Sequence, residues 1–339
     1  MPESSSRVTP HPPLALTLGD AAGIGPEIIV KLHNQGLPAA CVVYGDLGAL
    51  SRAVDLLNQP LQIIELATVD EIHQYTNATN RIFVRPTQPA LPADLPWGRT
   101  DARAGQAAYD ALCMAIDDAL LGKVSGIVTA PLNKEAMHLA GLDFPGHTEI
   151  LAQRSRTQHV AMLLVNDQLR VILATIHIAL SEVSTTLTQA LELRTIEHAQ
   201  RACQAMGIQS PRIGVAGLNP HAGEQGKFGR EDLDIIAPAI AAARLKGIDA
   251  SGPWPGDTLF MRARHGEFDI CVAQYHDQGL IPIKYLGIDK GVNITVGLPF
   301  VRTSVDHGTA FDIAGQGIAD PSSLRAAFEL ALSMLKPAI

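Results

Sequence analysis

The chain has 339 residues, of which 47% are hydrophobic and 18% are charged, and its formal net charge at pH 7 is −8. This composition can bury a core large enough for two domains of ordinary size. The acidic balance argues against a nucleic-acid-binding protein, whose surface would be basic. No apolar run reaches the ~20 residues of a membrane-spanning helix, so we expect neither nucleic acid nor membrane as a partner.

The N-terminal segment MPESSSRVTPHPP has no apolar signal-peptide core, and its composition predicts a disordered tail. Each cysteine stands alone inside an apolar segment, without the spacing of a metal site: Cys41, Cys113, Cys203 and Cys271. Isolated buried thiols are typical of proteins in a reducing compartment. We therefore expect a cytoplasmic protein.

The first elements predict a parallel, doubly wound sheet. Leu14–Leu18 is a short apolar strand, followed by the turn GDAAGIGPE and a helix through about Asn34. The turn could bind phosphate, or it could be a plain tight turn with Pro26 opening the helix. A second strand at Ala40–Tyr44 and a second helix at Leu47–Leu57 continue the alternation that is typical of such sheets.

The middle of the chain adds a helix at Ala102–Leu121 and a strand at Val124–Ala130. A further helix opens at the sequence GHTE, where Thr148 is the expected N-cap. Val160–Val165 and Leu169–Thr175 flank an Asn-Asp pair and predict an antiparallel hairpin. We expect this apolar hairpin at a sheet edge or a subunit interface, where it would pair with a second copy in a homodimer.

The second half repeats the alternation of strands and helices. Its expected elements are a helix at Leu187–Met206, a strand at Arg212–Gly217, a helix at Glu231–Leu245, a strand at Phe268–Gln274 and a final helix that begins at Pro321, is capped by Asp320 and runs to about Leu335.

Three histidines share one kind of position. His177 ends LRVILATIH, His221 follows RIGVAGLNP, and His276 ends FDICVAQYH, so each lies at the carboxyl end of an apolar strand. Open α/β sheets place their ligands at such ends, and three imidazoles with a vacant position suit a divalent metal. Each histidine could equally be a hydrogen-bonded residue at a strand end, because their separation along the chain is no metal signature.

Two carboxylates lie near this cluster in the sequence. Asp277 directly follows His276, so it can orient an imidazole or act as a catalytic base. Asp257, in PGDTLF, is a second candidate for catalysis and equally a candidate helix cap.

The stretch from Gln274 to Pro321 concentrates glycines and polar residues that a structural protein has little use for. Lys284, Asn293 and Arg302 within it predict a site for an anion such as phosphate. We expect this stretch to form much of an active site.

The segments YHDQGL, KGVNITVGLPFVRTSVDHGTA and LNPHAGE resemble the PdxA family, the 4-hydroxythreonine-4-phosphate dehydrogenases of pyridoxal phosphate synthesis and their close relatives. The resemblance runs from LTLGDAAGIGPEI to the last helix. It implies a two-domain α/β/α sandwich of the isocitrate/isopropylmalate dehydrogenase type, with the active site in the interdomain cleft. Residues 1–130 and 305–339 would form the first domain, and residues 131–304 the second.

The resemblance also implies roles for single residues. The metal ligands would be His177, His221 and His276, holding one Zn, Mg or Co ion per site, shared between the partners of a homodimer. The substrate-binding residues would be His147, Thr148, Lys284, Asn293 and Arg302. The loop HGTAFDIAG resembles the adenosine-binding loop of isopropylmalate dehydrogenases, in which His307, Gly308 and Asp312 would bind the cofactor. Asp312 would favour NAD over NADP by repelling a 2′-phosphate; the alternative is an ordinary glycine-rich loop.

The implied reaction is the NAD- and metal-dependent oxidation, with decarboxylation, of a phosphorylated four-carbon hydroxy acid. In the pyridoxal phosphate pathway it converts 4-phosphooxy-L-threonine to 3-amino-2-oxopropyl phosphate. LTLGDAAGIGPE and IALSEV are closer to the PdxA2 branch, which oxidises D-threonate or D-erythronate 4-phosphate, and a further relative oxidises an aromatic cis-dihydrodiol dicarboxylate. Rivals of other classes are a non-catalytic phosphate sensor and an acyl- or phosphotransferase.

Overall fold

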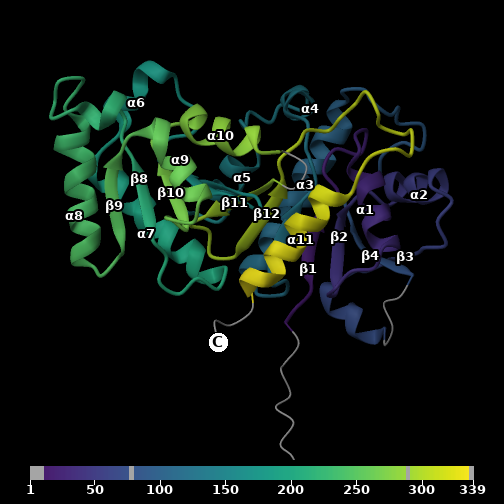
Figure 1. Ribbon diagram of the computed structural model, residues 1–339. Helices are drawn as coiled ribbons and strands as arrows, with labels where there is room; N and C mark the ends of the chain where they lie inside the picture. The colour runs from purple at the N-terminus through teal and green to yellow at the C-terminus, as the bar shows by residue number, and fades with distance from the viewer. Residues whose placement is uncertain (1–10, 76–79, 288–290, 336–339) are drawn as a thin grey trace, which may run out of the picture.

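The computed structural model describes residues 11–75, 80–287 and 291–335. Within these ranges twelve strands form one sheet, in the order β3-β4-β2-β1-β5-β12-β11-β6-β7-β10-β8-β9. Helices cover both faces of the sheet (Figure 1), so the predicted α/β/α sandwich is confirmed. Within the described ranges, no helix combines the length and the apolarity that crossing a bilayer would require.

One half of the strand order, from β3 to β12, is called one side of the sheet here and is built from the first part of the chain and from β12. Its strands pair in parallel: β1 (Leu14–Thr17), β2 (Cys41–Gly45), β3 (Gln62–Glu65), β4 (Arg81–Pro86), β5 (Gly126–Thr129) and β12 (Val301–Val305). The helices of this side are α1 (Gly25–Asn34), α2 (Leu47–Leu56), α3 (Ala102–Leu120), α4 (Lys134–Leu139), α5 (His147–Arg154) and α11 (Ser322–Leu335).

The other side is built from the second half of the chain. Its strands are β6 (Ala161–Val165), β7 (Arg170–Leu173), β8 (Ile213–Ala216), β9 (Ala250–Trp254), β10 (Ile270–Ala273) and β11 (Val292–Val296). Its helices are α6 (Val183–Thr186), α7 (Gln189–Ala205), α8 (Ala237–Leu245), α9 (Gly256–Arg264) and α10 (His276–Tyr285).

The predicted hairpin exists, but its predicted place at a sheet edge is wrong. Asn166 forms its turn by accepting the backbone N–H groups of Gln168 and Leu169 at 2.9 and 2.8 Å. Strand β6 pairs with both β11 and β7, and β7 pairs in parallel with β10. Both strands therefore lie inside the sheet, where every ladder is filled by this chain.

Antiparallel pairs occur only at the centre of the described sheet, between β12 and β11, β11 and β6, and β6 and β7. Because of these reversals, the parallel strands on the two sides run in opposite directions. The strands β5 and β12 therefore point with their carboxyl ends in one direction, and β7, β8 and β10 point in the opposite direction. A site that uses both sets of ends must extend across the central strands.

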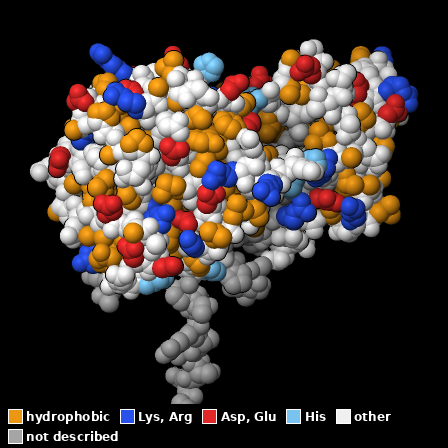
Figure 2. Space-filling view, turned by 180° about the vertical axis from the view of Figure 1, so that it is seen from behind, with side chains coloured by type: hydrophobic (Ala, Val, Ile, Leu, Met, Phe, Trp, Pro, Cys, Tyr) orange, Lys and Arg blue, Asp and Glu red, His pale blue; other side chains and the backbone are white. Residues whose placement is uncertain are grey.

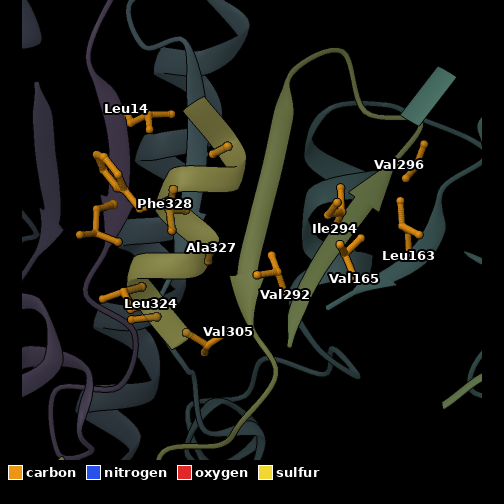
Figure 3. Close-up of a cluster of buried hydrophobic side chains, with 14 of the residues drawn as sticks. Leu14, Leu163, Val165, Val292, Ile294, Val296, Val305, Leu324, Ala327 and Phe328 are labelled. Carbon is orange, nitrogen blue, oxygen red and sulfur yellow. The ribbon is translucent and has the colours of Figure 1, made fainter. Parts of the chain in front are cut away.

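Helix α11 packs over the junction of the two sides. Figure 3 shows Leu324, Ala327 and Phe328 of α11 facing Leu14 and Val305, and all five side chains are buried. The same hydrophobic cluster continues through β11 and β6 (Figure 3). The division into two domains near residues 130 and 304 stays a prediction, since the sheet pairs without a break between β5, β12 and β11.

Two local expectations differ from the structure. Helix α5 begins at His147 after Gly146 as the N-cap, so Thr148 is a residue of the first turn and no cap. Helix α10 was not predicted, because it contains Gly279 and Pro282, two residues that disfavour helices. A Cβ at Gly279 would lie 2.5 Å from a Leu173 side-chain carbon, so glycine lets this helix lie close against β7.

Candidate active site

A cavity of about 280 Å³ lies over the central strands β6, β11 and β12. Residues from both sides of the sheet line it, in agreement with the predicted interdomain cleft. Helix α10 runs along it, because His276 in its first turn and Lys284 in its last turn both line the cavity. Figure 2 shows the molecule from behind, with acidic and basic side chains interspersed and a hollow between two lobes. No broad basic surface appears on that face.

His177 and His276 meet at one end of the cavity. Their ring centroids are 5.8 Å apart, although they follow different strands, β7 and β10. These strands are parallel neighbours, so their carboxyl ends, and the loops that follow, lie side by side. Two imidazoles on a tetrahedral metal at 2.0–2.1 Å would place their ring centroids about 5 Å apart. The observed pair fits two ligands of such an ion.

Each of these rings has a carboxylate beside Nδ1. Oδ1 of Asp277 lies 2.7 Å from Nδ1 of His276, and Oε1 of Glu149 lies 3.9 Å from Nδ1 of His177. Metal-binding histidines are commonly oriented in this way through the nitrogen that does not bind the metal. Burial lowers the pKa of His177, and the charge of Glu149 opposes this effect. A neutral imidazole is the form that binds a metal.

His221 does not join this pair within the chain. It lies in the turn Pro220–Gly223, after β8, near the ring of Phe228 with the centroids 6.3 Å apart. Among the described residues, no group of three or more His, Cys, Asp or Glu side chains has the geometry of a metal site. One chain therefore supplies two of the three predicted ligands to its cavity.

The predicted carboxylates take different places. Asp277 contacts His276, but its side chain is 70% exposed. Asp257 lies in the first turn of α9, is exposed, and is absent from the cavity lining. Helix α9 contacts the turn Pro220–Gly223, which carries His221.

Arg302 gives the cavity a buried positive charge. Its side chain donates hydrogen bonds to Oγ1 of Thr295 at 2.9 Å and Oγ1 of Thr129 at 2.7 Å, while Nε has no partner. Arg302 is only 2% exposed, and burial lowers its pKa to about 9, against the attraction of Glu149. A buried guanidinium held only by hydroxyl groups is well placed for an anionic ligand.

The other predicted substrate-binding residues line the same cavity: His147, Thr148, Lys284 and Asn293. Burial lowers the pKa of His147 well below its usual value, and the charges of Arg302 and Lys134 lower it further, so this imidazole is neutral. The Oδ1 atom of Asn293 is buried without a partner. Lys284 forms an ion pair with Asp306, with Nζ 3.0 Å from Oδ2.

The predicted cofactor loop is only partly at the cavity. His307 and Gly308 line it, whereas Asp312 is exposed outside it. The loop packs against Trp97 through Gly315, where an added Cβ would lie 2.6 Å from the indole ring. Lys31 holds the end of the loop by donating to the carbonyl oxygens of Gly317 and Ala319 at 2.9 and 2.6 Å.

Three charged residues of the cavity were not predicted: Lys134, Glu149 and Asp306. Glu149 directly follows Thr148 in the GHTE segment, and Asp306 directly precedes His307. Lys134 follows the end of β5 in the same way that the histidines follow their strands. Their position beside predicted residues, or at a strand end, was the available signal.

Comparisons with known proteins agree with this geometry. The family model "Pyridoxal phosphate biosynthetic protein PdxA" matches residues 38–331. A 4-hydroxythreonine-4-phosphate dehydrogenase from Beijerinckia indica subsp. indica is 53% identical over 326 residues, 96% of each chain. A D-threonate 4-phosphate dehydrogenase from Cupriavidus necator is 48% identical over 317 residues, 92% of this chain and 94% of the relative.

The solved structures show the same relationship. The crystal structure of 4-hydroxythreonine-4-phosphate dehydrogenase from Klebsiella pneumoniae has a TM-score of 0.86 at 45% identity, covering 96% of this chain and 98% of that one. A β-decarboxylating dehydrogenase from Thermococcus kodakarensis has a TM-score of 0.51 at 13% identity, covering 96% and 83%, which shows the shared fold alone. By its sequence, its fold and the arrangement of its cavity, the chain belongs to the PdxA family of dehydrogenases.

Proposed function

We propose that the chain oxidises a phosphorylated four-carbon hydroxy acid with NAD and a divalent metal. The favoured substrate is 4-phosphooxy-L-threonine, which would yield 3-amino-2-oxopropyl phosphate for pyridoxal phosphate synthesis. The observation that carries this proposal is one cavity with a buried guanidinium, Arg302, and a histidine pair, His177 and His276. A substrate with a phosphate at one end and an oxidisable hydroxyl at the other matches that arrangement.

The phosphate would bind at Arg302, with Lys284 as a second cation. A dianion in a buried site is best held by charge-assisted hydrogen bonds, and Nε of Arg302 is free to donate one. His147 and Thr148 line the cavity at the start of α5, where backbone N–H groups point out of the helix. Neutral His147 can donate a hydrogen bond to the phosphate without competing for its protons.

The hydroxyl and carboxylate end would lie at His177 and His276. A divalent ion bound there, with Zn, Mg and Co as candidates, would acidify the hydroxyl and polarise the ketone that forms. Asp277 holds His276 through Nδ1 and leaves Nε2 for the ion. Asp277 and Asp257 are the proposed groups for moving the hydroxyl proton. The β-keto acid formed by the oxidation loses CO₂ readily.

The nicotinamide cofactor would take the hydride, bound along the loop that starts at His307 and Gly308. Both residues line the cavity, so the loop can bring a dinucleotide to the substrate. Asp312 lies further along, exposed, where it could bind a ribose hydroxyl and repel a 2′-phosphate. NAD is therefore the proposed cofactor.

The active unit would be a homodimer with shared sites. The cavity holds two imidazoles, and a third must come from elsewhere for a complete three-histidine site. Exposed apolar side chains lie on the segments that carry or adjoin the histidines: Ile178 and Leu180 after His177, Phe228 beside His221, Met261 on α9, and Ile281 and Tyr285 on α10. An apolar surface at this place fits a second copy of the chain, which would bring its His221 and Asp257 to the cavity.

The second candidate substrate is D-threonate or D-erythronate 4-phosphate. It is favoured by the relative named D-threonate 4-phosphate dehydrogenase, at 48% identity, and by the segments LTLGDAAGIGPE and IALSEV. The two substrates differ at C2, where one carries an ammonium group and the other a hydroxyl. We place the protein in the cytoplasm, because all four cysteines are buried free thiols.

The test is a substrate panel with purified dimer, Zn²⁺, Mg²⁺ or Co²⁺, and NAD, read as NADH absorbance. The panel contains 4-phosphooxy-L-threonine, D-threonate 4-phosphate, D-erythronate 4-phosphate and a cis-dihydrodiol dicarboxylate. The highest kcat/KM is expected for 4-phosphooxy-L-threonine. A higher kcat/KM for D-threonate or D-erythronate 4-phosphate would show that the second candidate is the substrate. Tight binding of a phosphate ester without formation of NADH would indicate a non-catalytic phosphate sensor. Transfer of an acyl or phosphoryl group without NAD would indicate a transferase.

A further inference from the structure

Two buried side chains meet below the loops that carry His276 and His221. Gln274, wholly buried, precedes His276 by two residues at the end of β10. Its Nε2 donates to the carbonyl oxygen of Ala216 at 2.8 Å and to Oε1 of Glu192 at 3.1 Å. Ala216 is the last residue of β8, the strand that leads to His221. This contact therefore ties the two histidine-bearing strand ends together.

A second amide makes a parallel link. Nε2 of Gln278 donates to the carbonyl oxygen of Gly217 at 2.7 Å, and its Oε1 accepts from the backbone N–H of Gln274, also at 2.7 Å. The ladder between β10 and β8 ends at Val272 and Val215. The two side-chain amides thus continue the connection beyond the backbone ladder, where the strands turn into loops.

Glu192, on α7, accepts the hydrogen bond from the Gln274 side chain. Its side chain is wholly buried, and burial raises the pKa of its carboxyl to about 7, an effect that the hydrogen bond from Gln274 opposes and Asp232 adds to. Buried carboxyls destabilise a fold unless they are paired. An apolar residue of similar size at such a position commonly leaves the folded state equally stable or more stable. The hydrogen bond from Gln274 partly offsets the cost of burying this carboxyl and ties Glu192 to the end of β10.

The His221 side is held in an uncommon backbone conformation. His221 and Ala222 have φ values of 53° and 52°, in the left-handed region that residues with a Cβ rarely adopt. The carboxylate of Asp232 accepts the backbone N–H groups of Leu218 and Asn219 at 2.8 and 3.2 Å. Strain of this kind persists where the surrounding contacts fix it, and it occurs often at functional sites.

We propose that Glu192, Gln274 and Gln278 form a brace that positions His276 and His221 for metal binding. The inference rests on the proposed shared metal site. His276 lies in the cavity of its own chain, while His221 lies outside it, so the brace fixes the distance between ligands of two different sites of the dimer. These three residues are positioning residues, since they act on the ligands only through the backbone.

The test is a Co²⁺ titration of the metal-free dimer, followed by the visible absorption of the bound ion. Glu192→Leu removes the acceptor of Gln274, and Gln278→Met removes the link to Gly217. Each is expected to weaken Co²⁺ binding about tenfold, the lower end of the range for residues behind metal ligands, and to change the absorption spectrum. Glu192→Gln keeps an acceptor oxygen and should restore both affinity and spectrum.

The matched control is Asp118→Asn. Asp118 is also buried on a helix and accepts a hydrogen bond from the Tyr44 hydroxyl at 2.8 Å, but it belongs to α3, which packs on β1, β2 and β5. It should lower the melting temperature without changing Co²⁺ affinity.

Wild-type affinity and spectrum in Glu192→Leu and Gln278→Met would overturn the brace, whatever their melting temperatures. Equal weakening in Asp118→Asn would overturn it too, by showing a general effect of destabilisation. If Glu192→Leu does not fold, the half-buried Gln278→Met carries the test. A wild-type dimer that binds no Co²⁺ would refute the proposed metal site itself, which is a separate result.

Discussion

Nζ of Lys284 lies 3.0 Å from Oδ2 of Asp306, and this ion pair joins the last turn of α10 to the end of β12. The first turn of the same helix places His276 beside His177. Helix α10 thus connects the proposed anion-binding residues on one side of the sheet to the histidine pair on the other. The distance between phosphate and metal in the proposed complex is set by this helix.

Arg302→Met should lower kcat/KM for the phosphorylated substrate about 100-fold, mainly through KM. The charge-assisted hydrogen bond from the free Nε of Arg302 to the phosphate would be lost; such a bond is worth about 1.5–3 kcal/mol, and ~2.7 kcal/mol corresponds to 100-fold. The discriminating measurement repeats the assay with the unphosphorylated hydroxy acid, for which the variant and the wild type should differ little. An equal loss with both substrates would mean that Arg302 supports the fold and does not bind phosphate.

The shared metal site predicts which variants complement each other. Because His177 and His276 meet within one chain and His221 does not, a mixed dimer of His177→Ala and His221→Ala chains should contain one intact site out of two. Metal-dependent NADH formation should return on mixing, towards half of the wild-type activity in mixed dimers.

The matched control mixes His177→Ala with His276→Ala chains. Every site in that dimer lacks one ligand, so activity should stay absent although mixed dimers form, as mass spectrometry would confirm. Recovery in the control, without recovery in the first mixture, would show that His276 is the ligand that crosses the interface. Sedimentation of the wild type as a monomer at micromolar concentration would contradict the shared site.

Asp277→Asn tests the orientation of His276. The asparagine keeps the size of the side chain but removes the charge beside Nδ1, which should weaken Zn²⁺ or Co²⁺ affinity about tenfold. Metal affinity is measured directly by competition with a chelator, and Asp70→Asn, at an exposed carboxylate that does not line the cavity, provides the comparison. Unchanged metal affinity with a large loss of kcat would instead assign Asp277 to proton transfer.

Asp312→Asn should narrow the preference for NAD over NADP. Removing the carboxylate removes the repulsion of a 2′-phosphate, so kcat/KM with NADP should rise while that with NAD falls. The ratio of the two kcat/KM values is the measurement. A wild-type chain that uses NADP at least as well as NAD would show that the loop has been misinterpreted.

The sequence predicted the elements whose patterns are local. Apolar runs between turns located β1, β2, β5, β8 and β10, and glycine marked the ends of several helices. The position of His177 and His276 at strand ends is also visible in the local sequence, whereas their meeting depends on the pairing of β7 with β10, segments about 100 residues apart. Specific residue roles, in contrast, came from the family resemblance.

What failed depends on contacts between distant segments. The sequence predicts the hairpin at a sheet edge or a subunit interface, yet β6 pairs with β11. The paired residues Val165 and Val292 are 127 positions apart in the chain. Helix α10 was missed because Gly279 is disfavoured in helices and is required here only by the closeness of Leu173. The left-handed backbone at His221 and Ala222 was likewise not predicted, because no residue type in LNPHAGE indicates it.

Asp20 provides a test of the fold that does not depend on the metal. It lies in the turn after β1, is wholly buried, and accepts the backbone N–H of Ala22 at 2.8 Å, while Oδ2 has no partner. Burial raises its pKa from 3.8 to about 6; the hydrogen bond from Ala22 opposes this rise, and the charge of Asp101 adds to it. The folded protein therefore holds a proton on Asp20 that the unfolded chain loses at lower pH.

The sign of the effect follows from that difference. Between about pH 4 and pH 6 the folded state binds more protons at this site than the unfolded state, so the free energy of unfolding falls as the pH rises. Above pH 6 the loss would be on the order of 3 kcal/mol. Asp20→Asn keeps the acceptor for Ala22 and carries no charge, so its stability relative to the wild type should increase from pH 4 to pH 8. Urea unfolding of both proteins at the two pH values measures this difference, and a constant difference would mean that Asp20 titrates normally in the folded state.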